Sequence, residues 1–269
     1  MHNKVVIITG ASSGIGIACA REFAAKGASV VLAARNAGAI GKLAKEMISK
    51  GLEAYAVKTD VSVENECRDL IEATVNKYGR IDVLINNAGI SMRALFNEVD
   101  LKVLKKLMDV NFWGTVYCTK YALPYLVESK GSVAGISSIA GFHGLPGRTG
   151  YSASKFAMQG FLEALRIENL KNDLHVLIAA PGFTSSNVRK SALIANGSEQ
   201  GDSPRTEEKM MQPEEVAKCI FKAIKKRKRS MILTSQGKLT VLLKKITPGI
   251  LDSLVYKHFA EEPDSPFKK

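Results

Sequence analysis

The stretch TGASSGIG, residues 9–16, decides how this chain folds. It continues the apolar run VVIIT at 5–9, which has the length and β-branched character of a strand buried in a parallel sheet. A helical pattern begins at Gly14, so the glycines stand where a strand turns into a helix. There Gly10 permits a tight turn, Gly14 lets the backbone approach a pyrophosphate, and Gly16 lets the helix pack closely on the sheet. Because N–H groups at a helix start attract phosphates, this turn predicts a dinucleotide-binding site.

Strand and helix patterns alternate along the chain as far as residue 182. We expect further strands at 27–35, 53–60, 81–89, 131–138 and 175–182, and helices at 14–26, 37–50, 64–78, 101–128 and 151–170. A helix at 213–229 and a short strand at 230–236 follow. Because parallel strands need crossover helices, the alternation predicts an α/β, doubly wound parallel sheet, the Rossmann fold. We expect a single domain over 1–235 with a C-terminal helical extension over 236–269.

The composition suits one globular domain of a reducing compartment. The chain has 269 residues, of which 46% are hydrophobic, and its four cysteines show no CxxC spacing. They lie in otherwise periodic segments, so we expect buried thiols, no disulfides and no metal site. The first residues show neither a charged leader nor a cleavage site, and no run of 18 apolar residues is present. These features predict a cytoplasmic location.

The positive charge is concentrated toward the C-terminal end. Ten Lys or Arg and no Asp or Glu lie between 216 and 251, which accounts for most of the net charge of +12. The densest part is KKRKR at 225–229. Such a run suits an anionic membrane surface or nucleic acid. Because no aromatic platform or recognition module accompanies it, we do not expect nucleic-acid binding.

Five motifs resemble the short-chain dehydrogenase/reductase family over residues 3–235. They are TGASSGIG at 9–16, NNAG at 86–89, SS at 137–138, YSASK at 151–155 and PG at 181–182. The resemblance implies an NAD(P)-dependent oxidoreductase with a cofactor site formed by Gly10, Ser12, Ser13, Gly14, Ile15, Gly16, Arg35, Asp60, Val61, Asn87, Ala88, Gly89, Tyr151, Lys155, Pro181, Gly182, Phe183 and Ser186. Ser186 stands where relatives often carry a threonine.

The pair Tyr151 and Lys155 is the candidate catalytic centre. Positions i and i+4 share one helix face, although such a pair alone is more often a solvated surface. The resemblance implies that Tyr151 exchanges a proton with the substrate oxygen and that Lys155 holds the nicotinamide ribose. A phenol ordinarily has a pKa near 10. We expect the nearby ammonium of Lys155 to lower the pKa of Tyr151, because a positive charge favours the phenolate.

Two further catalytic positions follow from the resemblance. Ser138 stands thirteen residues before Tyr151, the family's spacing for the serine that binds the substrate carbonyl, and Ser137 competes for that role. Asn111, in DVNFWG, matches an asparagine that connects the lysine to a proton relay. The structural alternative for Asn111 is an Asn that caps or kinks a helix.

The end of the second expected strand bears on the choice of cofactor. Ala34 stands where NAD-specific relatives carry an acid, and Arg35 follows it. An arginine forms a charge-assisted contact with a 2′-phosphate, so we expect NADP(H), although Arg35 could face water. Asp60 matches an adenine-binding aspartate, and a helix N-cap explains it nearly as well.

Two histidines and one long segment carry weaker signals. His143 lies between Ser138 and Tyr151, where it could touch substrate, but a lone loop histidine is more often exposed to solvent. His175 opens a strand and is expected to be structural. The polar stretch at about 187–211 is too long for an ordinary connection and predicts a lid over the substrate site.

The C-terminal extension has the pattern of two short amphipathic helices. Apolar residues at 239, 242, 243 and 246 follow helical spacing, with lysines at 238, 244 and 245 on the other side, and Pro248 and Gly249 then interrupt the pattern. The extension could contact a membrane surface near a lipid-like substrate. It could equally pack on the substrate cleft or on a sister subunit.

The sequence as a whole predicts an NADPH-dependent carbonyl reductase or alcohol dehydrogenase. Its substrate would be a ketone, an aldehyde or a secondary alcohol. By resemblance we expect a homodimer or homotetramer with contacts through the helices at 101–128 and 151–170. A non-catalytic NADP(H)-binding sensor is the alternative, and the complete set of Ser138, Tyr151, Lys155 and Asn111 argues against it.

Overall fold

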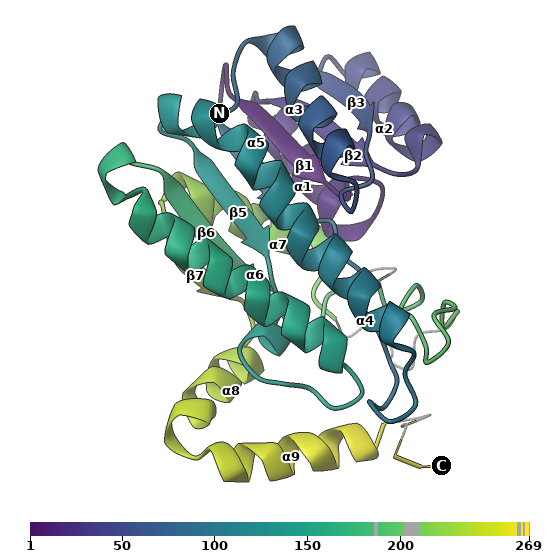
Figure 1. The fold of residues 1–269 in the computed structure, drawn as a ribbon. Coiled ribbons are helices and arrows are strands. Elements are labelled where there is room, and N and C mark those ends of the chain that lie inside the picture. The colour runs from purple at the N-terminus through teal and green to yellow at the C-terminus, as the bar shows by residue number, and fades with distance from the viewer. Residues whose placement is uncertain (186–187, 202–209, 263–264, 266, 269) are drawn as a thin grey trace.

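The computed structural model describes residues 1–269 except 186–187, 202–209, 263–264, 266 and 269 (Figure 1). Seven parallel strands form one sheet in the order β3-β2-β1-β4-β5-β6-β7. The strands are β1 (Val5–Thr9), β2 (Ser29–Ala34), β3 (Ala54–Lys58), β4 (Val83–Asn86), β5 (Ser132–Ile136), β6 (His175–Ala180) and β7 (Ser230–Ile232). The predicted doubly wound fold is therefore confirmed.

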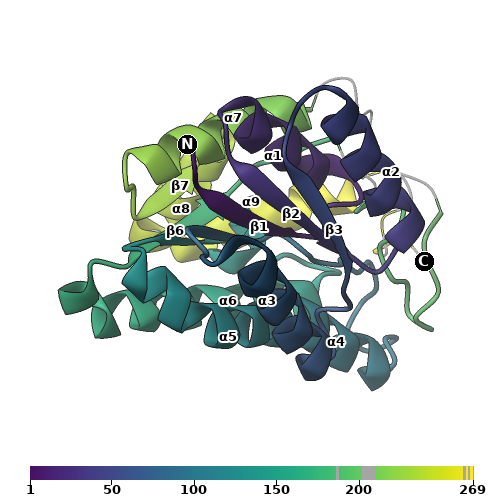
Figure 2. The ribbon, with the colours of Figure 1, turned by 90° about the horizontal axis from the view of Figure 1, so that it is seen from above.

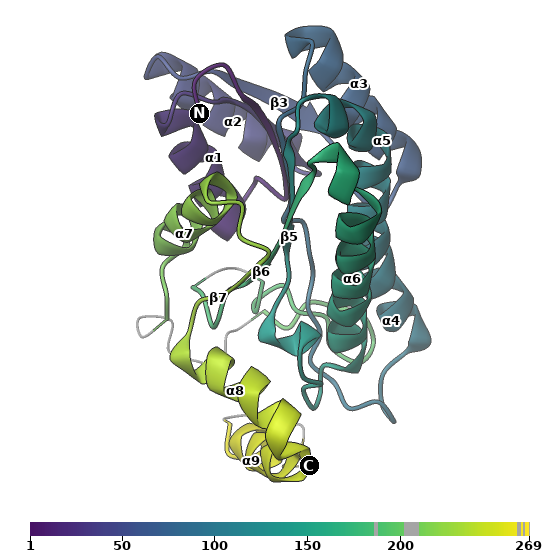
Figure 3. The same cartoon turned by 90° about the vertical axis from the view of Figure 1, so that its left-hand side faces the viewer.

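Helices cover both faces of the sheet, as Figures 2 and 3 show. One face carries α1 (Gly14–Ala25), α2 (Ala37–Ser49) and α7 (Pro213–Lys225), and the other carries α3 (Glu64–Tyr78), α4 (Leu101–Met108), α5 (Gly114–Glu128) and α6 (Thr149–Glu168). Strand β1 is buried throughout, with Val6 and Ile8 in the core under α1 and α7 and Val5 and Ile7 in the core under α3 and α5. Burial on both faces explains its continuous apolar sequence.

The prediction of a single helix over 101–128 is wrong in one respect. Helix α4 ends at Met108, a π-helical turn runs over Asp109–Trp113, and α5 begins at Gly114. The sequence does not reveal the turn, whose one buried residue is the polar Asn111. Two short 3-10 turns also occur, at Ile139–Gly141 and Leu170–Asn172.

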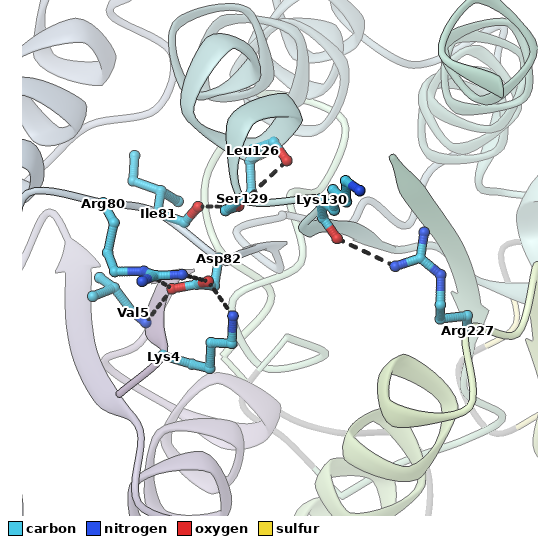
Figure 4. A network of polar contacts seen from close by, with 9 residues as sticks. All are labelled: Lys4, Val5, Arg80, Ile81, Asp82, Leu126, Ser129, Lys130 and Arg227. Atoms are coloured by element: carbon cyan, nitrogen blue, oxygen red, sulfur yellow. Dashed lines mark hydrogen bonds and ion pairs between the residues drawn. The ribbon is translucent and has the colours of Figure 1, made fainter. Parts of the chain in front are cut away.

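The amino edge of the sheet is closed by a charged network around Asp82 (Figure 4). The Asp82 carboxylate, only 4% exposed, accepts hydrogen bonds from Lys4 Nζ at 2.8 Å, Arg80 Nη2 at 2.7 Å and the Val5 backbone N–H at 2.9 Å. Burial alone would raise the pKa of Asp82, but the bonds from Arg80, Lys4 and Val5 outweigh it and hold that pKa below its usual value. The network fixes where β1 and β4 begin.

The basic run over 225–229 belongs to this same edge. Helix α7 ends at Lys225, four residues before the expected end, and Arg227 takes a left-handed backbone with φ 48°. Its guanidinium donates to Lys130 O at 3.2 Å (Figure 4) and to Asp173 Oδ1 at 2.7 Å. The basic run, through Arg227, therefore contacts the segments that precede β5 and β6 and holds them together.

The extension forms the two helices expected from its sequence, α8 (Ser235–Ile246) and α9 (Pro248–Ala260). They project from the carboxyl edge of the sheet (Figures 1 and 3). Because β7 lies between the basic run and α8, the two features lie toward opposite ends of this strand. Among the described residues, none of the helices is both long and apolar enough to cross a membrane.

The four cysteines are free thiols. Cys19, Cys67 and Cys118 are fully buried, whereas Cys219 is partly exposed. Burial raises the pKa of the Cys19 thiol to about 12, helped by the charge of Glu22. The buried thiols serve as small apolar core residues, as predicted.

Candidate active site

A cleft of about 650 Å³ opens at the carboxyl edge of the sheet. It lies where the strand order reverses between β1 and β4, the usual position for a ligand in a doubly wound sheet. The predicted site residues that line it are Gly10, Ser12, Ser13, Gly14, Ile15, Arg35, Asp60, Val61, Asn87, Ala88, Gly89, Ser138, Tyr151, Lys155, Pro181, Gly182 and Phe183. Gly16 and Asn111 are buried behind the lining, and Ser186 lies outside the described residues.

The turn between β1 and α1 is packed against the end of β4. Gly10 has φ 65°, and a Cβ atom at Gly16 would overlap the Gly10 carbonyl oxygen. Asn87 Nδ2 donates to that oxygen at 3.2 Å and to Thr9 O at 2.9 Å. Thr9 Oγ1 accepts the backbone N–H groups of Asn87 and Ala88, each at 3.0 Å. Thr9 thus helps to form the cleft, and it was not among the site residues predicted from the sequence.

The cofactor half of the cleft fits a phosphate-bearing dinucleotide. Helix α1 begins at Gly14 in the cleft wall, so its N-terminal N–H groups and the hydroxyls of Ser12 and Ser13 form a donor-rich cradle. Arg35 is exposed at the cleft wall directly after β2, where it can meet an anionic group. The donor set matches an anionic pyrophosphate with an additional phosphate beside it.

Asp60 lines the cleft without capping a helix. Its Oδ1 accepts the N–H of Ser62 at 3.0 Å and the Ser62 hydroxyl at 2.7 Å, which closes a tight turn after β3. Helix α3 begins later, with Val63 at its N-cap position. The N-cap explanation for Asp60 is therefore wrong.

Helix α6 presents Tyr151 and Lys155 to the cleft one turn apart. Lys155 is 3% exposed, its Nζ donates to Ile136 O at 2.8 Å, and it lies 5.8 Å from the centre of the Tyr151 ring. Burial lowers the pKa of Lys155 to about 8, because the ammonium is removed from water. A backbone carbonyl thus holds this ammonium beside the phenol.

The expectation that Lys155 would lower the pKa of Tyr151 is not met in this structure. Burial raises the pKa of Tyr151 above its ordinary value, and it outweighs three opposing influences. These are the hydroxyl of Ser138 and the positive charges of Arg148 and Arg189, all of which lower the pKa of Tyr151. Tyr151 therefore holds its proton at neutral pH, and the two arginines are site residues that no sequence motif marked.

The two adjacent serines have different roles. The Ser138 hydroxyl lies close enough to Tyr151 to lower the pKa of the phenol, and Ser138 Oγ accepts the Ala140 N–H at 3.2 Å. Ser137 Oγ instead accepts a bond from the buried Gln159 side chain, with Nε2 at 2.7 Å. The structure thus places Ser138 beside the phenol and ties Ser137 to α6.

Asn111 lies in the π-helical turn and is fully buried. Its Oδ1 accepts the Ile90 N–H at 2.8 Å, and its Nδ2 donates to Ile90 O at 3.0 Å and Ser154 Oγ at 2.9 Å. Ser154 in turn donates to Tyr151 O at 2.8 Å. A Cβ atom at Gly89 would lie 3.1 Å from Asn111 Oδ1 and 3.5 Å from Lys155 Nζ. Because glycine has no side chain, it leaves room for both polar groups at this position.

The histidines lie outside the cleft lining. His143 is 7% exposed rather than open to solvent, and its Nε2 lies 3.5 Å from the carboxylate of Asp252 in α9. His175 bonds Ser132 Oγ at 2.9 Å and Lys228 O at 2.8 Å, a structural position as expected. Among the described residues, no group of His, Cys, Asp and Glu is placed to hold a metal ion.

Comparison with known proteins gives consistent matches. The family model of short chain dehydrogenases matches residues 4–196. The chain is 36% identical to dehydrogenase/reductase SDR family member 7B of Bos taurus, covering 98% of this chain and 84% of that protein. It is 34% identical to 11-beta-hydroxysteroid dehydrogenase 1A of Arabidopsis thaliana, covering 94% of this chain and 74% of that protein.

Two solved structures share the fold. A short-chain dehydrogenase/reductase from Burkholderia phymatum, crystallised with NAD, superposes with a TM-score of 0.83 at 23% identity, covering 93% of this chain and 95% of that one. An alcohol dehydrogenase from Thermococcus sibiricus, complexed with 5-hydroxy-NADP, superposes with a TM-score of 0.74 at 25% identity, covering 86% and 95%.

The buried ammonium of Lys155 predicts a pH-dependent stability. An unfolded chain keeps this proton up to about pH 10.5, whereas the folded chain loses it near pH 8. Between these values the unfolded state binds more protons, so the free energy of unfolding should rise with pH, by about 1.4 kcal/mol per unit from this group. Denaturant unfolding of the wild type and Lys155→Met across pH 7–11 tests this expectation, and parallel curves would contradict it.

Proposed function

Because the chain belongs to the short-chain dehydrogenase/reductase family, we propose that it is an NADPH-dependent carbonyl reductase that also runs in the alcohol dehydrogenase direction. The observation that carries the proposal is the cluster at the cleft wall, in which Tyr151, Ser138 and Lys155 line the same cleft and the Lys155 ammonium lies 5.8 Å from the centre of the Tyr151 ring. A phenol that keeps its proton is suited to protonate a substrate oxygen.

The residues divide the chemistry among them. When bound, NADPH supplies the hydride to the carbonyl carbon. Ser138 donates a hydrogen bond to the carbonyl oxygen, and Tyr151 delivers its proton as negative charge develops there. Lys155 stabilises the phenolate that Tyr151 leaves behind, since a positive charge nearby favours the ionised phenol. Asn111 and Ser154 hold the backbone and side chains that position this pair.

The preference for NADP(H) rests on Arg35. It stands at the cleft wall after β2, and Ala34 before it offers no carboxylate to a ribose 2′-hydroxyl. A guanidinium binds a 2′-phosphate through charge-assisted bonds. The alcohol dehydrogenase from Thermococcus sibiricus, complexed with 5-hydroxy-NADP, is a precedent for an NADP-type ligand on this fold.

We also propose a peripheral membrane contact through α8 and α9. Their outer surface, here called the tail surface, exposes large apolar residues to between 53% and 66%, namely Leu239, Leu242, Ile246, Ile250 and Leu254. Lys238, Lys245 and Lys257 are exposed on the same helices, as suits an anionic interface. A cytoplasmic location and a homodimer or homotetramer stay predictions.

Replacing Tyr151 by phenylalanine tests the reductase. NADPH consumption is followed with a panel of carbonyls that runs from small diketones to sterol ketones and long-chain acyl ketones. We expect Tyr151→Phe to lower kcat by about 100-fold or more, because general acid catalysis contributes at least this much. The control is Tyr125→Phe on α5, outside the cleft lining. Retention of most of the turnover in Tyr151→Phe would show that the mechanism is wrong.

Replacing Arg35 by alanine tests the cofactor assignment. The Kd for NADPH should rise by about tenfold or more, as expected for a lost charge-assisted hydrogen bond, while the Kd for NADH changes little. Lys58→Ala, at the exposed end of β3 and outside the cleft lining, is the matched control. Equal losses for both dinucleotides in Arg35→Ala would exclude a contact with the 2′-phosphate.

Cosedimentation with phosphatidylcholine–phosphatidylserine vesicles tests the tail surface. The triple variant Leu239→Glu, Ile246→Glu and Ile250→Glu should abolish binding, because it places carboxylates on the apolar surface that enters the interface. The control triple Ile48→Glu, Ile167→Glu and Leu170→Glu changes equally exposed apolar residues elsewhere and should bind as the wild type does. Equal binding by both variants would remove the membrane proposal.

A further inference from the structure

The segment after β4 is paired with two other parts of the cleft wall. The Leu193 N–H donates to Ser91 O at 2.9 Å, and the Arg93 N–H donates to Leu193 O at 2.8 Å. The next residue, Ala94, donates its N–H to Gly147 O at 3.0 Å. These backbone bonds join the loop that follows β6 and the loop that precedes α6 through one short stretch of chain.

Residues 91–94 and 191–195, here called the wall junction, pack around a small hydrophobic core separate from the two that flank the sheet. Tyr151 packs against this core from α6. The buried members of the core are Met92, Ala94, Val99, Val103, Leu107 and Leu193. Because Ser91 and Leu193 also line the cleft, the wall junction both forms part of the cleft wall and supports the catalytic phenol.

A buried ion pair attaches the wall junction to the end of the chain. Arg93 Nη2 lies 3.3 Å from Glu262 Oε2, and the two side chains are 8% and 7% exposed. Glu262 comes two residues after α9, so the pair joins positions 169 residues apart. A buried pair contributes little net stability compared with apolar side chains, because both charges lose their hydration. It does demand a defined geometry, since either charge is costly to bury without its partner.

We propose that Arg93 and Glu262 are positioning residues for the substrate half of the cleft. The Glu262 carboxylate holds the Arg93 guanidinium, and the backbone bonds between Arg93 and Leu193 then keep the wall junction where a long carbonyl substrate needs it. This inference rests on the proposed reductase function. It assigns part of the substrate selectivity to a residue beyond the region 4–196 that the family model matches.

The place of the wall junction in the cleft predicts an effect that depends on the size of the substrate. A small diketone is held mainly by hydrogen bonds with Ser138 and Tyr151, whereas a long-chain ketone must also pack along the cleft wall. If the ion pair only stabilised the fold, both ketones would be affected alike. Dinucleotide binding, which depends on the β1–α1 turn and Arg35, should not change under either explanation. The KM for the long ketone therefore separates the two roles.

The kinetic experiment compares the NADPH-dependent reduction of 2,3-butanedione and of 2-dodecanone in Glu262→Gln, Arg93→Gln and the double variant. Each single variant should raise the KM for 2-dodecanone about tenfold and change kcat by less than about twofold, because uniform binding is lost. The KM for 2,3-butanedione and the Kd for NADPH should change by less than about twofold.

The double variant should be no worse than either single variant, because two residues that act as a pair have non-additive effects. It also leaves neither charge of the pair buried alone, which favours folding. Glu261→Gln changes the exposed neighbour and should behave as the wild type does. Equal changes for both ketones, or additive effects of the two substitutions, overturn the positioning role.

Amide hydrogen exchange of the full chain tests the positioning role without relying on turnover. In Glu262→Gln, peptides that cover the wall junction should exchange faster than in the wild type, while peptides of β1 and α1 should keep their wild-type rates. Faster exchange throughout the chain, or unchanged exchange at the wall junction, overturns the proposal. If exchange changes only at the wall junction and the wild type reduces no carbonyl of the panel, the result supports the pair and counts against the proposed reductase.

Discussion

The close packing of the β1–α1 turn against the end of β4 is the constraint on which the rest of the cleft depends. Gly16 leaves room for the Gly10 carbonyl, and that carbonyl and Thr9 O are both held by Asn87. These contacts join the two strands at which the chain order reverses, so they set the width of the crevice. The charged network around Asp82 fixes the same pair of strands at the opposite edge. With both ends of β1 and β4 held, the helices on either face present their side chains to a cleft of defined shape.

Within that cleft, the loss of hydration determines the direction of the pKa shifts of Lys155 and Tyr151. The ammonium of Lys155 loses hydration, and one backbone carbonyl, Ile136 O, compensates only in part, so its pKa falls. The phenol of Tyr151 is subject to the same burial, which raises its pKa despite two nearby guanidiniums. Both shifts favour the neutral form of the group, so burial favours a protonated phenol at Tyr151 and lowers the affinity of Lys155 for its proton. Tyr151 is therefore suited to donate a proton at neutral pH rather than to accept one.

The sequence was sufficient for the sheet, the crossover helices and the positions of Ser138, Tyr151 and Lys155, because these depend on local periodicity and on motifs with fixed spacing. Properties that depend on tertiary packing could not be predicted from the sequence. The π-helical turn buries Asn111 among contacts with Ile90 and Ser154, and His143 is buried and faces Asp252 of α9, more than a hundred residues later. Arg148 and Arg189 lie in irregular segments without a motif, and only the fold brings their charges to Tyr151. The prediction for the direction of the Tyr151 pKa shift was wrong because this shift also depends on tertiary packing. Spacing along a helix indicates which charges are nearby, but it does not indicate how far the phenol is removed from water.

The C-terminal helices have a role within the fold as well as an outer surface. Lys244 of α8 donates to Phe142 O and lies 4.6 Å from the centre of the Phe156 ring, while Asp252 of α9 faces His143. These contacts fall on the loop between Ser138 and Tyr151 and on the residue after Lys155. After α9, Glu262 forms a buried ion pair at 3.3 Å with Arg93, in the segment that follows β4. Side-chain contacts thus attach α8 and α9 to the segment between Ser138 and Tyr151 and to the segment after β4, so the two helices stabilise the wall of the domain that carries the catalytic residues.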